Sequence, residues 1–491
     1  MIQFHQVSFT YQESPQKGGL HKIDLTIQDG ECVLLCGRSG CGKTTLTRLV
    51  NGLIPAFYPG ELSGSVTIDG AVVQDCPMYH LAEIVGSVFQ NPRSQFFNVD
   101  TDSEMVFGME NLSWSKERMK ERLETAIQYL QIENLVGRGI FELSGGEKQK
   151  VAFASIYAMS PNIYLLDEPS SNLDVDAIED LHKTLTLLKR QGKTILIAEH
   201  RLYYLRDIVD RIFYMEDGGI RQSFTPAELG EIPEETRHSM GLRAIDLSQV
   251  RTPEPTQVQV PPVLEIRNLS LSYQKRSILS GISLQAAPGE IIGIIGHNGA
   301  GKSTFSRALC GLHKETTGTF YWKGKMLSAK ERLKHSYMVM QEVGYQLFAD
   351  SVEKECCFGI RHPDKEAARQ AMEQLGIWPF RDFHPNTLSG GQKQRVAVAV
   401  SMVCQRDILI FDEPTSGLDY DSMAQVSQLF QTLASMGKVI FVVTHDYEFL
   451  TAACSRVLHL DNGGVVGDYA ISPENEGKLQ EFFLQKQEAA T

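Results

Sequence analysis

Residues 37–44 read GRSGCGKT and residues 296–303 read GHNGAGKS, and these two stretches decide the fold of this 491-residue chain. Both match the pattern GxxxxGK[ST], whose glycines let the backbone turn its N–H groups inward around phosphate. Each stretch directly follows an apolar run of strand length, at residues 32–36 and 291–295. Because a run of helix length comes next, the context predicts a phosphate-binding loop at a helix N-terminus rather than an ordinary glycine turn.

The rest of the chain is duplicated in the same order. Three further motifs recur: an LSGG stretch at residues 143–149 and 388–394, an apolar run ending in Asp-Glu-Pro at 167–169 and 412–414, and a later histidine, His200 and His445. The offset between the copies is 245 residues for all three motifs (389 − 144, 412 − 167 and 445 − 200). Four motifs repeated in the same order, three of them at one offset, predict two copies of one nucleotide-binding domain that work as a pair.

Within each copy, strand-like and helix-like runs alternate, which predicts a parallel sheet covered by helices. The expected helices are 44–53, 115–132, 145–159, 303–312, 363–375 and 390–403, and the expected strands include 7–11, 195–198, 269–273 and 439–443. We expect a first domain over residues 1–248, with helical decoration over 225–247, and a second over 263–491. Residues 249–262 (QVRTPEPTQVQVPP) hold four prolines without apolar periodicity, which predicts an extended linker.

The bulk composition excludes several classes of protein. The formal net charge is −13, which argues against a general nucleic-acid binder. The nine cysteines form no CxxC pair, a pattern that favours reduced thiols over a zinc site or a disulfide framework. The N-terminus reads as a strand rather than a signal peptide, and no apolar run is long enough to span a bilayer. We therefore expect a cytosolic chain that reaches a membrane only through partners.

The loop lysines and hydroxyls have distinct expected roles. Lys43 and Lys302 can reach the β- and γ-phosphates of a nucleotide, and Thr44 and Ser303 can ligate Mg²⁺. A helix N-terminus is also a site where a thiol loses its proton readily. Cys41 lies inside the first loop, so we expect it to make that site sensitive to thiol reagents.

The paired carboxylates close two apolar strands. Asp167 and Asp412 stand where a carboxylate holds Mg²⁺, and each is followed directly by a glutamate. Glu168 and Glu413 would then face the γ-phosphate, where a carboxylate can orient and polarise the attacking water. An Asp-Glu pair alone more often caps a helix on the surface, but the preceding apolar run and the phosphate loop favour the catalytic interpretation.

The full motif set resembles that of the ATP-binding cassette (ABC) ATPases, over nearly the whole chain. The resemblance implies an α/β fold with two P-loop NTPase domains of ABC type, each with a RecA-like parallel-sheet core, an antiparallel β subdomain and a helical signature subdomain. It also implies that the two domains face each other head to tail within the chain. Each ATP, with its Mg²⁺, would then lie between the phosphate loop of one domain and the LSGG stretch of the other, which is the signature of the family.

The resemblance assigns matching residues to the two sites. Site one would use Tyr11 on adenine, Gly37, Ser39, Gly40, Gly42, Lys43, Thr44, Thr45, Gln90, Asp167, Glu168 and His200, closed by Ser389, Gly390 and Gly391. Site two would use Tyr273, Gly296, Asn298, Gly299, Gly301, Lys302, Ser303, Thr304, Gln341, Asp412, Glu413 and His445, closed by Ser144, Gly145 and Gly146. The implied catalytic residues are Glu168, His200, Glu413 and His445. The implied Mg²⁺ ligands are Thr44, Gln90 and Asp167, and Ser303, Gln341 and Asp412.

The segments after Gln90 and Gln341, the Q-loop glutamines of the family, resemble one branch of it. A second glutamine follows the first by five residues in both copies (95 − 90 and 346 − 341). This is similar to the ATPases of energy-coupling factor (ECF) importers of vitamins and metal ions, although the second copy lacks the Asn-Pro of the first. The resemblance implies a transmembrane T subunit docked at Gln95, Phe96, Phe97, Gln346, Leu347 and Phe348, and a substrate-binding S subunit. The chain would lie peripherally on the cytoplasmic face of the membrane.

Two other readings remain open at this point. The chain could be the ATPase of a non-ECF transporter, or a tandem ABC protein acting on ribosomes or DNA. The second class usually carries a long charged linker, a coiled-coil or zinc insertion, or an N-terminal cysteine cluster. This chain has a short linker almost without charge and no cysteine cluster, so the transport reading is favoured. The alternative that Phe96, Phe97 and Phe348 are simply core residues also remains open.

Overall fold

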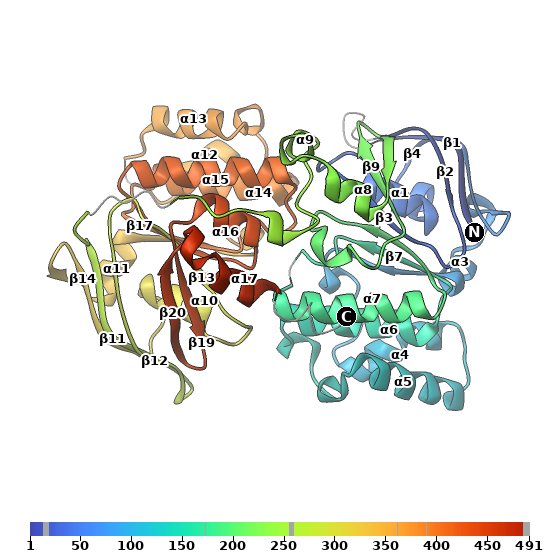
Figure 1. The fold of residues 1–491 in the computed structure, drawn as a ribbon, viewed down its shortest axis with the longest axis horizontal. Helices are drawn as coiled ribbons and strands as arrows, with labels where there is room; N and C mark the ends of the chain where they lie inside the picture. Colours follow the sequence, from blue (N-terminus) through green and yellow to red (C-terminus); the bar gives the residue numbers. More distant parts are fainter. Residues whose placement is uncertain (13–18, 172, 255–259, 361, 389, 485–491) are drawn as a thin grey trace. The chain divides into compact units, whose positions relative to one another are not determined.

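The computed structural model describes residues 1–12, 19–171, 173–254, 260–360, 362–388 and 390–484 (Figure 1). The chain divides into two compact units. The first holds Met1–Gln249 with Asp419–Asp421, and the second holds Val250–Leu418 with Ser422–Thr491. Residues 255–259 of the expected linker lie outside the described residues, while Thr252 donates a hydrogen bond to Glu476 within the second unit.

The first unit is built on a six-stranded sheet of order β10-β9-β3-β8-β7-β6. Its strands are β3 (Cys32–Gly37), β6 (Val85–Val88), β7 (Ile163–Asp167), β8 (Thr194–Ala198), β9 (Arg211–Glu216) and β10 (Gly219–Phe224). All neighbouring pairs are parallel except β9 and β10. Both faces of a parallel sheet are covered, which explains why β3 and β8 are continuous apolar runs that are fully buried.

A second, antiparallel sheet of the first unit has the order β2-β1-β4-β5. Its strands are β1 (Ile2–Tyr11), β2 (Leu20–Ile27), β4 (Gly60–Ile68) and β5 (Ala71–Val72). The apolar alternation of β1 changes phase between Phe4 and Val7, where the register shifts. Gln6 takes a positive φ of 49° at this bulge, so Ile2, Phe4 and Val7 all face the core.

Helices surround these sheets in the first unit. They are α1 (Lys43–Val50), α2 (Leu53–Ala56), α3 (Met78–Ile84), α4 (Thr101–Asn111), α5 (Lys116–Leu130), α6 (Gly145–Met159), α7 (Val175–Arg190), α8 (Pro226–Glu231) and α9 (Glu234–Ser239). The signature helix α6 has the bounds expected from the sequence. The loop helix α1 ends earlier than expected, at Val50, because Gly52 takes a left-handed conformation two residues later. The expected decoration over 225–247 contains only the two short helices α8 and α9.

The second unit repeats this architecture, with sheets of order β16-β17-β18-β13-β19-β20 and β12-β11-β14-β15. Its strands are β11 (Leu264–Tyr273), β12 (Arg276–Ala286), β13 (Ile291–Ile295), β14 (Thr316–Trp322), β15 (Lys325–Met326), β16 (Ser336–Val339), β17 (Ile408–Asp412), β18 (Val439–Val443), β19 (Arg456–Asp461) and β20 (Gly464–Ala470). The bulge recurs too, with Asn268 at φ 47°. The α/β fold class expected from the sequence is therefore confirmed in both units.

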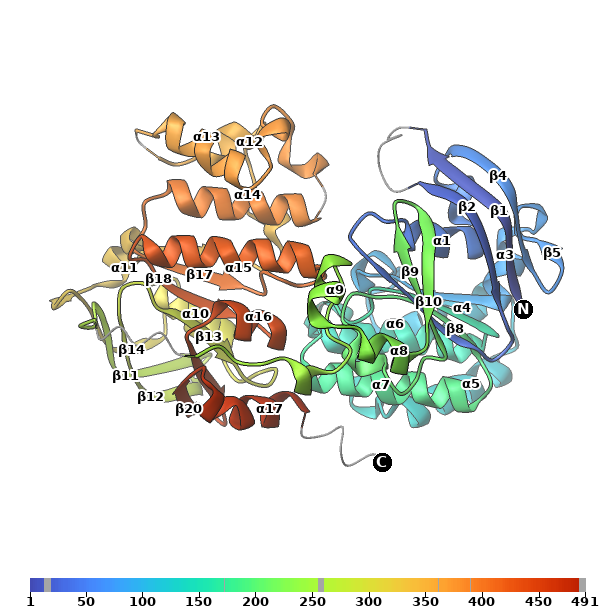
Figure 2. The same ribbon diagram turned by 45° about the horizontal axis from the view of Figure 1, so that its top comes forward.

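The second unit has its own set of helices. They are α10 (Lys302–Leu309), α11 (Ala329–His335), α12 (Val352–Cys356), α13 (Lys365–Gln374), α14 (Gly390–Val403), α15 (Tyr420–Ser435), α16 (Tyr447–Ala453) and α17 (Glu476–Leu484). Figure 2 shows α14 between the pair α12 and α13 and the long helix α15. Across the described part of the chain, no helix combines the length and the apolar character needed to cross a bilayer.

Candidate functional site

The two glycine loops connect β3 to α1 and β13 to α10. Their first glycines, Gly37 and Gly296, have φ angles of 143° and 148°. A Cβ atom at Gly37 would lie 2.2 Å from the carbonyl oxygen of Met215, and one at Gly296 would lie 2.0 Å from that of Leu460. No other residue fits at these positions, since both the backbone angle and the neighbouring strand exclude a side chain.

The loop lysines point into their own loops. Lys43 Nζ donates to the carbonyl oxygens of Gly37 (3.0 Å) and Arg38 (3.1 Å). Lys302 Nζ makes the matching bonds to Gly296 (2.6 Å) and His297 (3.0 Å). Both ammonium groups are buried, so each loop holds a positive charge at the N-terminus of a helix. That combination is suited to an anion such as a nucleotide phosphate.

A hydroxyl and a carboxylate meet beside each loop. Thr44 Oγ1 donates to Asp167 Oδ1 at 3.0 Å, and Ser303 Oγ donates to Asp412 Oδ2 at 3.4 Å. Burial, aided by the neighbouring Glu168, raises the pKa of Asp167 to about 6, and burial also raises the pKa of Asp412. A buried carboxyl with a raised pKa gains from a nearby cation. The oxygen donors present therefore fit Mg²⁺, a hard cation.

The glutamates after these aspartates contact the predicted histidines. Glu168 Oε1 lies 3.4 Å from His200 Nε2, and Glu413 Oε1 lies 3.6 Å from His445 Nε2. In the first unit, Gln90 Nε2 also donates to Glu168 Oε2 at 2.5 Å. Burial acts to raise the pKa of Glu168, but the hydrogen bond and charge of His200 lower it, and the net pKa lies below its usual value. The carboxylate is therefore held ionised, and its oxygens can accept a hydrogen bond from water.

The backbone of both glutamates is strained in the same way. Glu168 has φ 46° and Glu413 has φ 50°, in the left-handed region that side chains rarely adopt. Each N–H donates across to the next strand, to Ala198 at 2.7 Å and to Val443 at 2.9 Å. The same left-handed conformation therefore recurs at the two glutamates whose side chains contact His200 and His445.

The signature of the first unit caps its own helix. Ser144 is the N-cap of α6, and its Oγ accepts from the N–H of Glu147 at 3.3 Å in a capping box. Ser144 and Gly145 are exposed, whereas Gly146 is buried against α7. In the second unit, Gly390 begins α14 and is exposed, and the predicted Ser389 lies outside the described residues.

The remaining predicted nucleotide contacts lie around the loops. Ser39, Gly40, Asn298, Gly299, Ser303 and Gln341 are exposed, while Gly42 and Thr45 are buried and Gly301, Thr304 and Gly391 are half-buried. The two tyrosines predicted to stack on adenine differ. Tyr11 is half-buried and its hydroxyl lies 3.0 Å from Thr45 Oγ1, whereas Tyr273 is 60% exposed.

Cys41 corrects one expectation. The thiol is buried, and burial raises its pKa although Lys43 Nζ lies 3.9 Å from the sulfur. The expected preference for the thiolate at this helix N-terminus is therefore wrong. Desolvation outweighs both the lysine and the helix end, because the sulfur packs into the core with Leu46 and Met215.

The predicted docking residues divide into two groups. Phe97 and Phe348 are 75% and 71% exposed, and Phe97 stacks on Phe107. Leu347 is buried and Phe96 is half-buried, so the expectation that Leu347 forms part of a docking surface is wrong. Leu347 is packed in the interior, directly before the exposed Phe348.

The second glutamine of each Q-loop is bound within its own unit. Gln95 accepts from the N–H of Phe89 at 3.3 Å and donates to the carbonyl of Ser87 at 3.2 Å. Gln346 makes the matching bonds to Met340 at 3.0 Å and Met338 at 2.6 Å. Both side chains therefore brace the loop that carries the exposed phenylalanine.

Two buried glutamates that no motif pointed to brace the same turn. Glu104 accepts from the N–H groups of Phe97 (3.0 Å) and Asn98 (2.8 Å), and Glu355 accepts from those of Phe348 (2.8 Å) and Ala349 (2.6 Å). Each glutamate follows its Q-loop glutamine by 14 residues (104 − 90 and 355 − 341). That repeated spacing is the signal that could have found them.

Comparisons with known proteins agree with this geometry. A family model described as "ABC transporter" matches residues 20–171 and 279–416. Two proteins of Treponema denticola, both named "Putative ABC transporter ATP-binding protein", are 47% and 41% identical to this chain; the matches cover 98% and 99% of this chain and 99% and 100% of the relatives. The structure of an archaeal ribosome recycling factor, solved with a ribosomal stalk protein, has a TM-score of 0.67 at 22% identity and covers 97% of this chain and 92% of that one. This last likeness concerns the fold alone.

Proposed function

The chain belongs to the ABC transporter family and is a tandem ATPase with two cassettes that bind ATP with Mg²⁺, and from this premise we propose that it energises a membrane importer of the ECF type. We take residues 1–248 as the first cassette, residues 249–262 as the linker and residues 263–491 as the second cassette. One observation carries the proposal: Phe97 and Phe348 are exposed at the same place in both cassettes. A buried glutamate, Glu104 or Glu355, holds each turn. Large exposed apolar side chains held by a built turn support a partner-binding role.

The chemistry at each site follows from the contacts above. Bound Mg²⁺ would supply charge neutralisation at the transferred phosphoryl group. Lys43 and the loop N–H groups would hold the phosphates, and Thr44 and Asp167 would supply oxygen ligands for the metal. Glu168 accepts the proton of the attacking water at its carboxylate, while His200 orients that carboxylate. The second cassette offers the same roles in Lys302, Ser303, Asp412, Glu413 and His445.

We propose further that the two sites are completed within one chain, head to tail. The motivation is two full sets of half-sites on one polypeptide, joined by a short linker that keeps their effective concentration high. The double variant Glu168→Gln, Glu413→Gln with MgATP tests it by size-exclusion chromatography with light scattering. We expect one chain per particle with a smaller hydrodynamic radius. A doubled mass without compaction would show that the sites form between chains.

The docking proposal is tested in the native host. A tagged chain should fractionate with membranes and co-purify with a polytopic T-type subunit and a small S subunit. Phe97→Glu and Phe348→Glu should each release the chain into the soluble fraction while basal ATPase persists. Tyr79→Glu is the control, since Tyr79 is equally exposed, at 71%, but lies on α3.

The same fractionation also tests the alternative function, action on ribosomes. A tandem ABC protein acting on ribosomes would sediment with ribosomal particles, and the phenylalanine variants would not change its distribution. Mass spectrometry of the small molecule bound to the purified membrane complex would identify the cargo, which the proposal limits to a vitamin, a vitamin precursor or a metal ion.

A further inference from the structure

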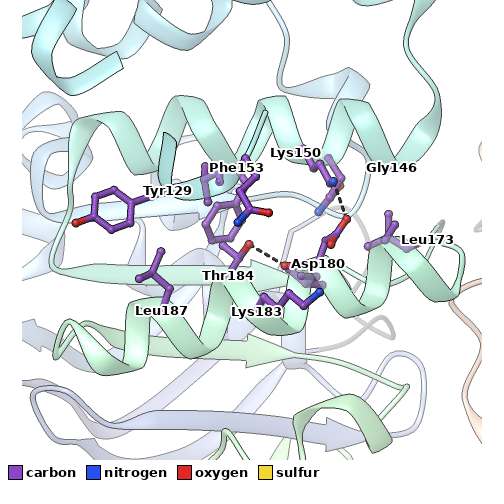
Figure 3. A pocket seen from close by; sticks show the side chains of 14 residues that line it. Tyr129, Gly146, Lys150, Phe153, Leu173, Asp180, Lys183, Thr184 and Leu187 are labelled. Carbon is purple, nitrogen blue, oxygen red and sulfur yellow. Dashed lines mark hydrogen bonds and ion pairs between the residues drawn. The ribbon is translucent and has the colours of Figure 1, made fainter. Parts of the chain in front are cut away.

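A cavity of about 410 Å³ lies between α6, α7 and the end of α5 in the first cassette (Figure 3). Phe153 and Leu187 form apolar walls near one end, and Gly146 of the signature lies at the other. Lys150, Asp180 and Lys183 form a polar side. The volume and the mixture of apolar walls with a few polar groups are those of a small-molecule site. The nucleotide chemistry described above uses none of this space beyond Gly146.

An unpaired donor lines this cavity. Gln149 is 6% exposed, and its Nε2 has no hydrogen-bond partner among the described residues. Its counterpart in the second cassette, Gln394, donates its Nε2 to the carbonyl oxygen of Pro414 at 3.0 Å. A buried amide without an acceptor is costly, so the cavity lacks one hydrogen-bond acceptor that a ligand would supply.

Each lysine of the cavity pairs with a carboxylate of α7. Two lysines and one aspartate line the cavity, and Lys150 Nζ pairs with Asp180 Oδ2 at 2.6 Å. Lys183 is exposed, and its Nζ pairs with Glu179 Oε1 at 2.6 Å. The second cassette has Arg395, Gln425 and Gln428 at the corresponding positions (each 245 residues later), so the paired charges belong to the first cassette.

We propose that this cavity binds a small aromatic molecule, whose ring lies against Phe153 and whose acceptor oxygen meets the Gln149 amide. Binding itself is independent of the proposed transport role. Because Gly146 and Leu173 line the cavity, an occupant contacts both the signature and the segment that follows the catalytic glutamate. The occupant therefore acts as an effector of ATP hydrolysis.

The probe is 1-anilinonaphthalene-8-sulfonate, an aromatic anion whose fluorescence reports burial, titrated into the full chain. We expect a saturable component with one site per chain. Gln149→Leu should weaken it about tenfold, the worth of one hydrogen bond, without lowering the melting temperature. The matched variant Gln394→Leu should bind the probe like the parent but melt earlier, because it loses an existing hydrogen bond.

A filled cavity gives the second arm of the test. Thr184→Phe and Leu187→Trp each add bulk from α7, and either one that retains a cooperative melting transition should abolish the saturable component. A saturating probe should change ATP turnover at least twofold in the parent and not in the filled variant. The proposed site is wrong if the parent shows no saturable component. It is also wrong if Gln149→Leu and the filled variants bind the probe as tightly as the parent does. Specific binding with unchanged turnover would overturn the effector role.

Discussion

The two cassettes share their phosphate-binding residues but hold the predicted catalytic histidine, His200 or His445, differently. The first reads Ala198-Glu199-His200-Arg201, and the second reads Val-Thr-His445-Asp446. The buried carboxylate that fixes the turn thus comes before the histidine in one cassette and after it in the other. A carboxylate therefore braces this turn in both cassettes, from two different positions.

The contacts of the two carboxylates show what each one does. Glu199 accepts from the N–H of His200 (2.7 Å), the N–H of Ser170 (3.1 Å) and the hydroxyl of Tyr204 (3.0 Å). It therefore ties the histidine turn to the segment two residues after Glu168. Asp446 accepts from the hydroxyl of Thr415, the counterpart of Ser170, at 2.9 Å.

The local secondary structure follows from the same difference. Asp446 is also the N-cap of α16, where its side chain accepts from the N–H of Phe449. Arg201 occupies that place in the first cassette and cannot cap a helix N-terminus, because it has no acceptor. The first cassette accordingly forms only the 3₁₀ turn η5 (Tyr203–Leu205) there.

The largest expected effect comes from the catalytic glutamates, which the comparison treats as equal. Glu168→Gln and Glu413→Gln each remove the proton acceptor while the phosphate loops and metal ligands remain. We expect each to slow hydrolysis at its own site about 100-fold or more, with ATP still bound. Single-turnover assays with labelled ATP measure this. Parental turnover in either variant would show that one site is structural and that the two cassettes are not equivalent.

Glu199→Ala should have the next largest effect and should separate the cassettes. It leaves several buried donors unpaired, each costing ~1–3 kcal/mol, so we expect the free energy of unfolding to fall by about 3 kcal/mol. Turnover should fall with little change in KM, because the histidine shifts while the phosphate loop does not. Thr444→Ala, at the matching position, is the control and should cost about 1 kcal/mol.

Denaturant unfolding and steady-state kinetics measure both variants. Glu199→Gln keeps an acceptor oxygen and should recover most of the turnover lost in Glu199→Ala. Equal stability losses in Glu199→Ala and Thr444→Ala would contradict the assignment of the carboxylate to different positions in the two cassettes.

Much of the fold and of the site could be predicted because local sequence encodes them. The signature helix α6 is fixed by Ser144 and Glu147, which form a capping box visible in the sequence. The histidine brace could not be predicted, since Glu199 acts through Ser170 and Tyr204, and such tertiary contacts leave no spacing pattern. The burial of Cys41 could not be predicted for a similar reason, since it depends on Met215, far along the chain.

Glu104→Gln and Glu355→Gln test a feature that the two cassettes share, the turn held by a buried glutamate. Each weakens hydrogen bonds to the turn that carries an exposed phenylalanine, at a cost of about 1–2 kcal/mol. We expect membrane recovery of the chain to fall several-fold while basal ATPase stays within about twofold, since the turn lies outside the nucleotide contacts. Fractionation followed by an ATPase assay measures both. A loss of ATPase with unchanged membrane recovery would assign these glutamates to the catalytic site instead.

The smallest effect is expected from Cys41→Ala, because Ala300 already occupies the matching place in the second loop. Removing one buried sulfur atom should cost about 1 kcal/mol of stability and leave ATPase within about twofold. N-ethylmaleimide should label the half-buried Cys76 and Cys357 before Cys41, since burial raises the pKa of Cys41 and shields its sulfur. Mass spectrometry of peptides from the native chain orders these rates. Cys41 labelled first, with protection by MgATP, would mean that the loop opens in solution and that the two loops differ in reactivity after all.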